Sequence, residues 1–320
     1  MTFPPVISLA EIRAARERLR GTVLRTPVVT LRHDAGLPDV RLKLENLQPI
    51  GSFKLRGAGN AMRAMTPESL GAGVWTASAG NMAQGVAWCA RELGVPCTVV
   101  VPDHAPATKV QAVERLGGRI VRRPFEEWWR LLVEHGSSEF PGRFIHPVSD
   151  VDVMAGNATV ALEILEDVPD VAAIVVPYGG GGLSCGIASA VRQLAPRVKV
   201  FAAEVETAAP LAPALAAGGP VSTAYTASFV DGIGGRSVLA EMWPLASSLL
   251  EGSLVVSLAQ VASALRLVME RNRVVAEGAG AAAVAAALAG GAGDGPVVAV
   301  VSGGNLDTRV LVRILQGELP

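Results

Sequence analysis

Lysine is scarce in this chain. Four of its 28 basic residues are lysines, at Lys43, Lys54, Lys109 and Lys199. Arginine stays protonated and cannot form an imine, so few side chains are available for amine chemistry. Lys54 has the most unusual setting, because it lies among small and flexible residues in the segment 51–58, GSFKLRGA. We therefore take Lys54 as the candidate for covalent chemistry.

Cysteine and histidine are also few. The three cysteines, Cys89, Cys97 and Cys185, lie in apolar segments without the spacing of metal ligands. This pattern predicts buried, reduced thiols in a cytoplasmic protein. The four histidines are scattered along the sequence, so we expect no zinc-like cluster and no metal site.

Excess charge and long apolar runs are missing as well. The net charge is −1 at pH 7, so the chain has no basic stripe for nucleic acid. No apolar run approaches the roughly 20 residues that span a bilayer. The first residues, MTFPP, do not have the basic and then apolar pattern of a signal peptide. We expect a cytoplasmic protein that acts on a small molecule, without a nucleic-acid or membrane partner.

The residues that are present predict an open α/β fold. Half of them are hydrophobic, and a length of 320 residues predicts one large or two modest domains. The predicted strands are unbroken apolar runs, which indicates a parallel sheet covered on both faces. Helical stretches alternate with them. The predicted strands are 40–44, 74–76, 96–101, 119–121, 171–176, 198–203 and 297–301.

These elements form two β/α sets, one at 74–123 and one from residue 171 onward. The polar segment 143–150 lies between them and is a candidate crossing point. The alanine-rich segment 279–295 predicts a close-packed helix that ends at a pair of glycines. The pair Trp128-Trp129 lies in an Arg- and Glu-rich segment and predicts a helix packing face.

Four consecutive glycines, Gly179, Gly180, Gly181 and Gly182, follow a predicted strand and open a predicted helix. Without Cβ atoms they let backbone N–H groups curl round an anion, and the helix N-terminus adds partial positive charge. The run has neither the Gly-Lys-Ser/Thr of a Walker loop nor the glycine spacing of a dinucleotide-binding motif. It predicts a phosphate-binding loop, with a flexible turn as the alternative.

Two serine motifs also follow predicted strands. Ser302 precedes Gly303, and it would place a hydroxyl in the crevice where open α/β sheets bind ligands. A plain serine-glycine turn is the alternative. The segment Ser78-Ala79-Gly80-Asn81 offers a hydroxyl, an amide and a helix N-terminus, which suits a substrate carboxylate. As an isolated motif it could instead be an N-cap.

Glu277 is flanked by apolar and very small residues, which predicts a partly buried carboxylate, either paired structurally or part of a site. Together the motifs describe one ligand. They supply a lysine for an imine, a phosphate loop, a hydroxyl for a ring nitrogen and a loop for a carboxylate. That combination fits pyridoxal phosphate bound to an amino acid.

In these motifs the chain resembles the serine/threonine dehydratase family of pyridoxal phosphate enzymes. The matching motifs follow the family's order along almost the whole chain: 43–46, 51–58, 78–81, 179–183, 271–273, 277–280 and 302–305. The resemblance implies fold type II, with two open α/β domains and the cofactor in the cleft between them. It implies a large cofactor-binding domain at 1–66 and 147–320, a small domain at 67–146, and a homodimer. No long C-terminal extension remains for the regulatory domain of biosynthetic threonine dehydratases, so the catabolic type is expected.

The resemblance also implies residue roles. Lys54 would bind the cofactor covalently and later remove the Cα proton of the substrate. Ser302 would face the pyridine nitrogen, and this neutral partner favours an unprotonated ring and prompt loss of a β-leaving group. The other implied cofactor contacts are Phe53, Asn81, Gly179, Gly180, Gly181, Gly182, Leu183, Glu277 and Gly303. The implied substrate contacts are Ser78, Ala79, Gly80, Asn81, Met82 and Asn157.

The implied reaction is the dehydration and deamination of a β-hydroxy amino acid, such as L-threonine or L-serine, to a 2-oxo acid and ammonia. Met82 stands where the family usually has histidine, and Asn157 where glutamine is common, which suggests an altered substrate pocket. Pro210 falls where the divalent-metal site of some relatives has an aspartate, beside Glu204 and Ala208. A full magnesium site is therefore not expected.

Ala79 bears on the alternatives. The racemase branch has a serine there as its second acid/base, and alanine cannot transfer a proton. The open alternatives are an amino-acid racemase, a hydroxyaspartate- or phenylserine-type dehydratase and a β-replacement enzyme on the same fold. A ligand-binding protein without catalysis is the alternative outside enzymes, and the presence of Lys54 argues against it. The preferred substrate, its stereochemistry and any cation dependence are left open.

Overall fold

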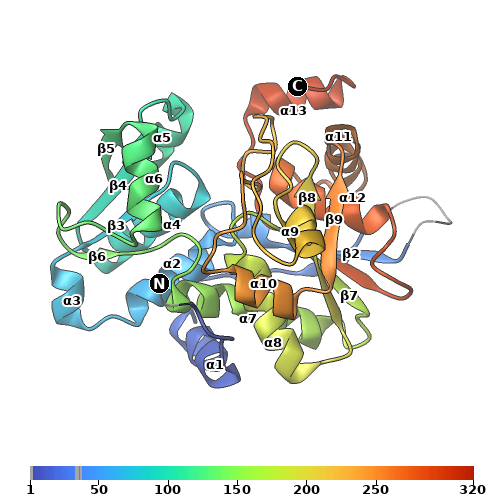
Figure 1. Cartoon of the computed structure of the whole chain (residues 1–320), viewed down its shortest axis with the longest axis horizontal. Helices are drawn as coiled ribbons and strands as arrows, with labels where there is room; N and C mark the ends of the chain where they lie inside the picture. The colour runs from blue at the N-terminus through green and yellow to red at the C-terminus, as the bar shows by residue number, and fades with distance from the viewer. Residues whose placement is uncertain (1–2, 33–35, 37) are drawn as a thin grey trace.

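The computed structural model of the chain describes residues 3–32, 36 and 38–320, so Met1, Thr2 and His33 lie outside the described part. The chain forms a six-stranded and a four-stranded sheet with helices packed on them, which confirms the predicted α/β class. Figure 1 shows the four-stranded sheet on the left and the six-stranded sheet on the right. None of the helices in the described ranges is long and apolar enough to cross a membrane.

The six-stranded sheet is parallel except at one edge. Its strands, in spatial order, are β1 (Val28–Thr30), β2 (Val40–Leu44), β10 (Val297–Val301), β7 (Ala173–Pro177), β8 (Lys199–Val205) and β9 (Gly252–Val256). β1 pairs antiparallel with β2, and the other pairs are parallel. Every residue of β7 and β10 is buried, as their unbroken apolar sequences predict for a sheet covered on both faces.

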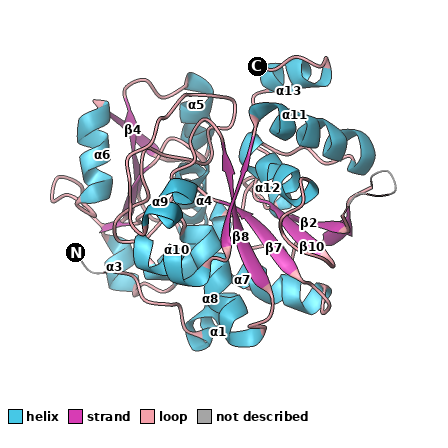
Figure 2. Cartoon of the chain, turned by 45° about the vertical axis from the view of Figure 1, so that its right-hand side comes forward, coloured by secondary structure: helices cyan, strands magenta, loops and turns pink. Residues whose placement is uncertain are grey.

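Successive side chains of the central strands point into two separate cores. Ile174 and Val176 of β7 belong to one core, and Ala173 and Val175 belong to the other. The first core is closed by α1 (Leu9–Arg18), α7 (Val151–Asp167), α8 (Gly182–Leu194) and α10 (Trp243–Leu249). The second is closed by α11 (Leu258–Leu267), α12 (Gly278–Leu288) and α13 (Thr308–Leu315). Figure 2 shows α1, α7 and α8 below the strands and α11, α12 and α13 above them.

The alanine-rich segment forms α12, as predicted, and its residues 278–287 are all buried. Their small side chains let this helix lie close to the sheet. Three shorter elements complete this part of the chain: the 3₁₀ turn Glu45–Leu47, α9 (Leu211–Ala217) and the π turn Val268–Asn272.

The four-stranded sheet is wholly parallel. Its strands, in spatial order, are β5 (Arg119–Arg123), β4 (Cys97–Pro102), β3 (Val74–Ala77) and β6 (Arg143–Phe144). Its helices are α3 (Pro67–Gly71), α4 (Asn81–Leu93), α5 (Ala107–Arg115) and α6 (Phe125–Val133). The expected crossing segment 143–150 contains β6 and leads into α7. Domain limits at residues 67 and 146 stay a prediction.

One helix, α2 (Lys54–Arg63), packs against both α4 and α7 and so joins the two halves (Figure 1). Glycines on its neighbours allow a very close approach. A Cβ atom on Gly85 of α4 would lie 3.1 Å from the carbonyl oxygen of Lys54. A Cβ atom on Gly156 of α7 would lie 2.3 Å from the carbonyl oxygen of Arg56. The backbone of α2 is therefore held tightly from both sides.

A buried ion network lies beside α2. Arg56, 1% exposed, donates hydrogen bonds of 2.7 Å to Glu45 and of 2.7 and 2.8 Å to Glu163. Lys43 on β2 donates to Glu163 at 2.5 Å and to the carbonyl oxygen of Thr26 at 2.6 Å. These charges tie β2, α2 and α7 together, and each has a partner of opposite sign.

Candidate active site

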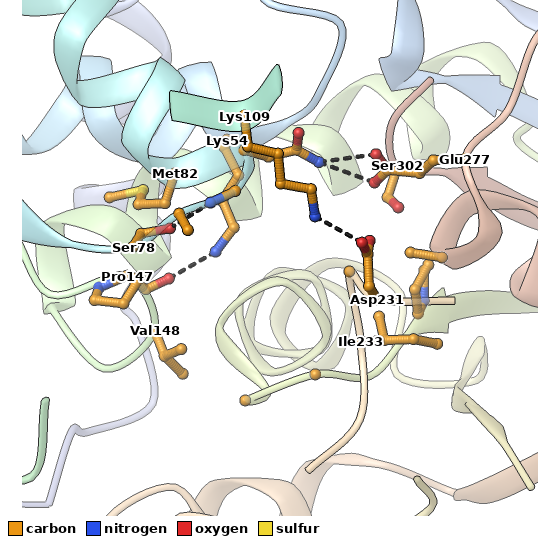
Figure 3. Close-up of a pocket in the computed structure, with 18 of the residues that line it drawn as sticks. Lys54, Ser78, Met82, Lys109, Pro147, Val148, Asp231, Ile233, Glu277 and Ser302 are labelled. Carbon is orange, nitrogen blue, oxygen red and sulfur yellow. Dashed lines mark hydrogen bonds and ion pairs between the residues drawn. The ribbon is translucent and has the colours of Figure 1, made fainter. Parts of the chain in front are cut away.

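A cavity of about 360 Å³ lies where the carboxyl ends of strands from both sheets meet. β3 leads into Ser78, β7 into the glycine run at 179–182 and β10 into Ser302, and all three segments line the cavity. Open α/β sheets bind ligands at this end of their strands. The volume is in the range of small-molecule sites. Most of the predicted site residues line this cavity, among them Lys54, Ser78 and Glu277 (Figure 3).

Lys54 begins α2, and its side chain points into the cavity. Its Nζ donates a hydrogen bond of 2.7 Å to the carbonyl oxygen of Pro147 and lies 5.2 Å from the centre of the Phe53 ring. Burial lowers the pKa of the amine from 10.5 to about 8, although the negative charge of Glu277 acts in the opposite direction. Lys54 is therefore much closer to the neutral, nucleophilic form at pH 7 than an exposed lysine.

This shift predicts the pH dependence of chemical labelling. In the protein without cofactor, acetylation of Lys54 by acetic anhydride should rise with pH about a midpoint near 8, because the neutral amine is the reactive form. Peptide mass spectrometry at a series of pH values measures the rate, with N-acetyl-lysine amide as the reference amine. A midpoint for Lys54 that coincides with the reference would contradict the burial of the amine.

Glu277 is buried at the opposite side of the cavity, and burial raises its pKa to about 7. The Asn81 amide donates to both of its carboxylate oxygens, at 2.9 and 3.0 Å. Asn305 in turn donates to the Asn81 side-chain oxygen at 2.8 Å and to the Ile50 carbonyl oxygen. Asn305 thereby fixes which end of the Asn81 amide faces Glu277 and the cavity. The motif around Asn305 is visible in the sequence, but this role is not.

The glycine loop fits a phosphate group. Gly181 has φ +98°, which favours glycine, and a Cβ atom on Gly180 or Gly182 would lie 2.6 or 2.5 Å from Val148. The loop therefore packs against Val148 without side chains in between, and it leads directly into the N-terminus of α8. Backbone N–H groups and the helix dipole make this a suitable anion cradle. Leu183 follows the loop and also lines the cavity.

Ser302 is 2% exposed and lines the cavity, and its hydroxyl has no hydrogen-bond partner among the described residues. Its carbonyl oxygen accepts a hydrogen bond from the N–H of Phe53, which fixes the backbone next to Lys54. A buried hydroxyl without a partner fits a ligand that accepts or donates one hydrogen bond. Gly303 lies behind it, where a Cβ atom would come within 2.5 Å of Glu277.

The predicted substrate loop lies on the other wall. Ser78, Ala79, Gly80, Asn81 and Met82 all line the cavity. The Ser78 hydroxyl accepts a hydrogen bond from the N–H of Gly80, and this local bond stabilises the turn of the loop. Met82 is 2% exposed and packs into the core of the four-stranded half, so it adds an apolar patch to the wall.

Asn157 is not brought to the cavity wall. It lies on α7 behind the glycine loop, where its amide donates to the Gly182 carbonyl oxygen at 3.4 Å. It also limits the space beside α2, because a Cβ atom on Gly57 would lie 2.7 Å from its side-chain oxygen. In this position Asn157 supports the loop from behind, and a direct contact with the substrate stays a prediction.

Several lining residues were not predicted. They are Pro102, His104, Ala105, Pro106, Lys109, Trp128, Pro147, Val148, Pro177, Asp231, Gly232, Ile233 and Ala279. Lys109 could have been found from the scarcity of lysine, and it forms an ion pair with Asp231. Trp128 was expected to pack in a helix face; it is half-buried on α6, donates to the Val100 carbonyl oxygen and reaches the cavity.

The histidines are less scattered in space than in the sequence. His135 and His146 stack with ring centres 4.5 Å apart, and the ligand atoms of these two residues and Glu241 lie within 4.8 Å of one another. However, Nδ1 of His146 already accepts hydrogen bonds from the N–H groups of Val148 and Ser149. Burial also lowers the pKa of His146 to about 3. One of the nitrogens of this cluster, Nδ1 of His146, is therefore already bonded to the backbone.

Comparison with known proteins identifies the family. The sequence model described as "Pyridoxal-phosphate dependent enzyme" matches residues 19–303. The chain belongs to this family. It is 40% identical over 282 residues to an L-threonine ammonia-lyase from Geobacter sulfurreducens, covering 87% of this chain and 70% of that protein. It is 35% identical over 290 residues to a catabolic L-threonine dehydratase from Staphylococcus aureus, covering 89% and 84% of the two chains.

Among solved structures, maize serine racemase superposes with a TM-score of 0.89 at 32% identity, covering 98% of both chains. The fold type II architecture expected from the family resemblance is thus confirmed. The cofactor of the family, pyridoxal phosphate, fits the glycine cradle, the partnerless Ser302 hydroxyl and the Lys54 amine. The metal site of some relatives does not fit, because the Glu204 carboxylate accepts from the N–H groups of Leu211 and Ala212 and from Ser253.

Proposed function

We propose that this protein uses pyridoxal phosphate to dehydrate and deaminate a β-hydroxy amino acid, with L-threonine or L-serine as the substrate, to a 2-oxo acid and ammonia. The observation that carries the proposal is one cavity that unites the buried Lys54 amine, the glycine cradle and the neutral hydroxyl of Ser302. The 40% identity to an L-threonine ammonia-lyase supports the choice of reaction.

Bound pyridoxal phosphate supplies an electron-withdrawing ring that stabilises negative charge at Cα of an attached amino acid. The N–H groups of the glycine loop would hold the phosphate, and Ser302 would donate a hydrogen bond to the ring nitrogen without protonating it. The loop at 78–81 binds the substrate carboxylate. With the cofactor bound, Lys54 would take the proton from Cα of the substrate and pass it to the departing β-hydroxyl, which leaves as water. Hydrolysis of the released enamine product then gives the 2-oxo acid and ammonia.

Asn81 and Glu277 position the polar end of the ring. The Asn81 amide points its N–H₂ group at the carboxylate of Glu277 and at the cavity, and Asn305 prevents it from turning over. When the cofactor is bound, this amide would offer a hydrogen-bond donor to its phenolic oxygen. Because Asn81 begins α4 and Glu277 immediately precedes α12, this contact also connects the two halves of the molecule.

Two measurements test the proposal. Reduction of the purified protein with borohydride, followed by peptide mass spectrometry, should give a cofactor adduct on Lys54. A screen of β-hydroxy amino acids for 2-oxo acid should show release from L-threonine or L-serine. An adduct on another lysine would contradict the site. Release from 3-hydroxyaspartate, phenylserine or O-acetylated substrates alone would contradict the substrate and favour the other dehydratases or a β-replacement enzyme. An adduct on Lys54 without any release would indicate a binding protein.

Racemisation is the second candidate, because the fold superposes on serine racemase. Ala79 lines the cavity but cannot transfer a proton, which argues against it. We expect Ala79→Ser to raise the ratio of serine racemisation to elimination by at least about tenfold, since a well-placed acid/base contributes about 10²–10⁴-fold. Chiral chromatography with a 2-oxo acid assay measures the ratio. Ala105→Ser, on the same cavity, is the control, and an unchanged ratio in Ala79→Ser would exclude this role for position 79.

We further propose that the protein is a cytoplasmic homodimer. Its three cysteines are buried free thiols, which is compatible with a reducing compartment. The dimer follows from the family resemblance, and sedimentation equilibrium of the holoenzyme tests it.

A further inference from the structure

One ion pair crosses the cavity from the four-stranded half to the six-stranded half. Nζ of Lys109, on α5, lies 2.6 Å from a carboxylate oxygen of Asp231, in the loop between α9 and α10. Both residues line the cavity, and Figure 3 shows the Lys109 side chain extending to Asp231. Their side chains are 32% and 58% exposed, so the pair lies at the end of the cavity that is open to solvent.

Lys109 would be an unpaired cation in the cavity wall if Asp231 were neutral. The other lysine of the described cavity wall, Lys54, is required for the cofactor. A bare ammonium group at the entrance would attract an acidic substrate side chain. Paired with Asp231, it presents no net charge, and a substrate side-chain carboxylate would also meet the negative charge of Asp231 itself.

The pair is close enough to act on the interior of the site. Beyond the main effect of burial, the charge of Asp231 raises the pKa of Glu277 and the charge of Lys109 lowers it. The two residues also come from opposite sides of the cleft, 122 positions apart, so their meeting is a property of the folded cavity. Another polar side chain of the rim, His104, is turned to Asp103, with Nδ1 3.1 Å from a carboxylate oxygen.

We propose that Asp231 is a specificity-determining residue. By neutralising Lys109 at the mouth of the cavity, it selects amino acids with uncharged side chains and excludes acidic ones. The inference rests on the proposed function in taking an amino acid as the ligand, but it concerns binding and not elimination. It can therefore be tested with ligands that have no β-leaving group.

The experiment compares the binding of L-2-aminobutyrate and L-aspartate to the holoenzyme by titration calorimetry. Neither ligand carries a β-hydroxyl, and they differ in the charge of the side chain. The unaltered protein should bind L-2-aminobutyrate more tightly than L-aspartate. Asp231→Asn should shift the ratio of the two dissociation constants toward L-aspartate by about tenfold or more, because it leaves Lys109 unpaired.

Two controls make the result specific. The double variant Lys109→Gln/Asp231→Asn removes both charges, and its ratio should return to within about twofold of the value for the unaltered protein. Glu251→Gln breaks the exposed pair with Lys199 at 3.0 Å, away from the cavity, and should leave the ratio unchanged. An unchanged ratio in Asp231→Asn, or an equal shift in the double variant, overturns the inference. Absence of 2-oxo acid from both L-threonine and L-serine would instead contradict the proposed function.

Discussion

A Lys54→Ala variant is expected to release 2-oxo acid from L-threonine about 10⁴-fold more slowly than the unaltered protein, or not at all. The substitution removes both the amine that binds the cofactor and the base that takes the Cα proton, and a positioned base alone contributes about 10²–10⁴-fold. No other described lysine of the cavity wall can take over, because Lys109 is held by Asp231. Initial rates of 2-oxo acid release with saturating cofactor measure the effect.

Lys199→Ala provides the matched control for this prediction. Lys199 is half exposed at the start of β8 and pairs with Glu251, so its removal should change the rate by less than about twofold. Melting temperatures of both variants show whether the fold is kept. If Lys54→Ala keeps more than a few per cent of the rate at an unchanged melting temperature, Lys54 is not the catalytic amine.

The second large effect is on stability. We expect Arg56→Ala to lower the free energy of unfolding by about 3–5 kcal/mol, the usual cost of removing one partner from a buried ion pair. Glu45 and Glu163 would then be left buried, with Lys43 as the remaining cation for both. Denaturant unfolding of the protein without cofactor measures this energy directly.

An ion pair on the surface provides the control that distinguishes the effect of burial from the effect of losing a charge. Arg266→Ala breaks a pair with Glu270 at 2.7 Å on the surface of the molecule, and we expect a loss below about 0.5 kcal/mol. Equal losses for Arg56→Ala and Arg266→Ala would show that the buried network does not stabilise the fold. A loss of more than about 3 kcal/mol confined to Arg56→Ala supports it.

Much of the site could be predicted because its parts are short segments at the ends of strands. Ser78, Gly179 and Ser302 each follow an apolar run, and topology alone brings the carboxyl ends of parallel strands together. They line one cavity together with Lys54, and their individual roles stay predictions. The α12 helix was predictable for a similar reason, since a run of small residues has few alternatives to close packing.

Other parts depend on contacts that no local pattern records. Lys109 and Asp231 meet across a cleft, and although lysine is scarce, nothing in either segment indicates that the two residues pair. Asn157 has a motif position that suggests a ligand contact, yet the path of α7 places it behind Gly182. The stacking of His135 on His146 likewise required the fold. Contacts of this kind depend on how elements that are distant in the sequence pack together, and the spacing of residues in the sequence does not specify that packing.

The close approach of glycines to α2 restricts which residues around the cavity can be substituted. Positions packed against α2 are constrained, whereas positions at the rim of the cavity are not. A methyl group on Gly156 would overlap the backbone of α2, and one on Gly85 would press tightly on the backbone that carries Lys54. Adjustment of the cavity to a new ligand therefore falls to its rim, where α5 and α6 carry Lys109 and Trp128. In hydrogen exchange, the amides of α2 should be among the last to open, and those of α6 among the first. New substrate preferences should accordingly be acquired by substitutions at the rim, with the chemistry of Lys54 undisturbed.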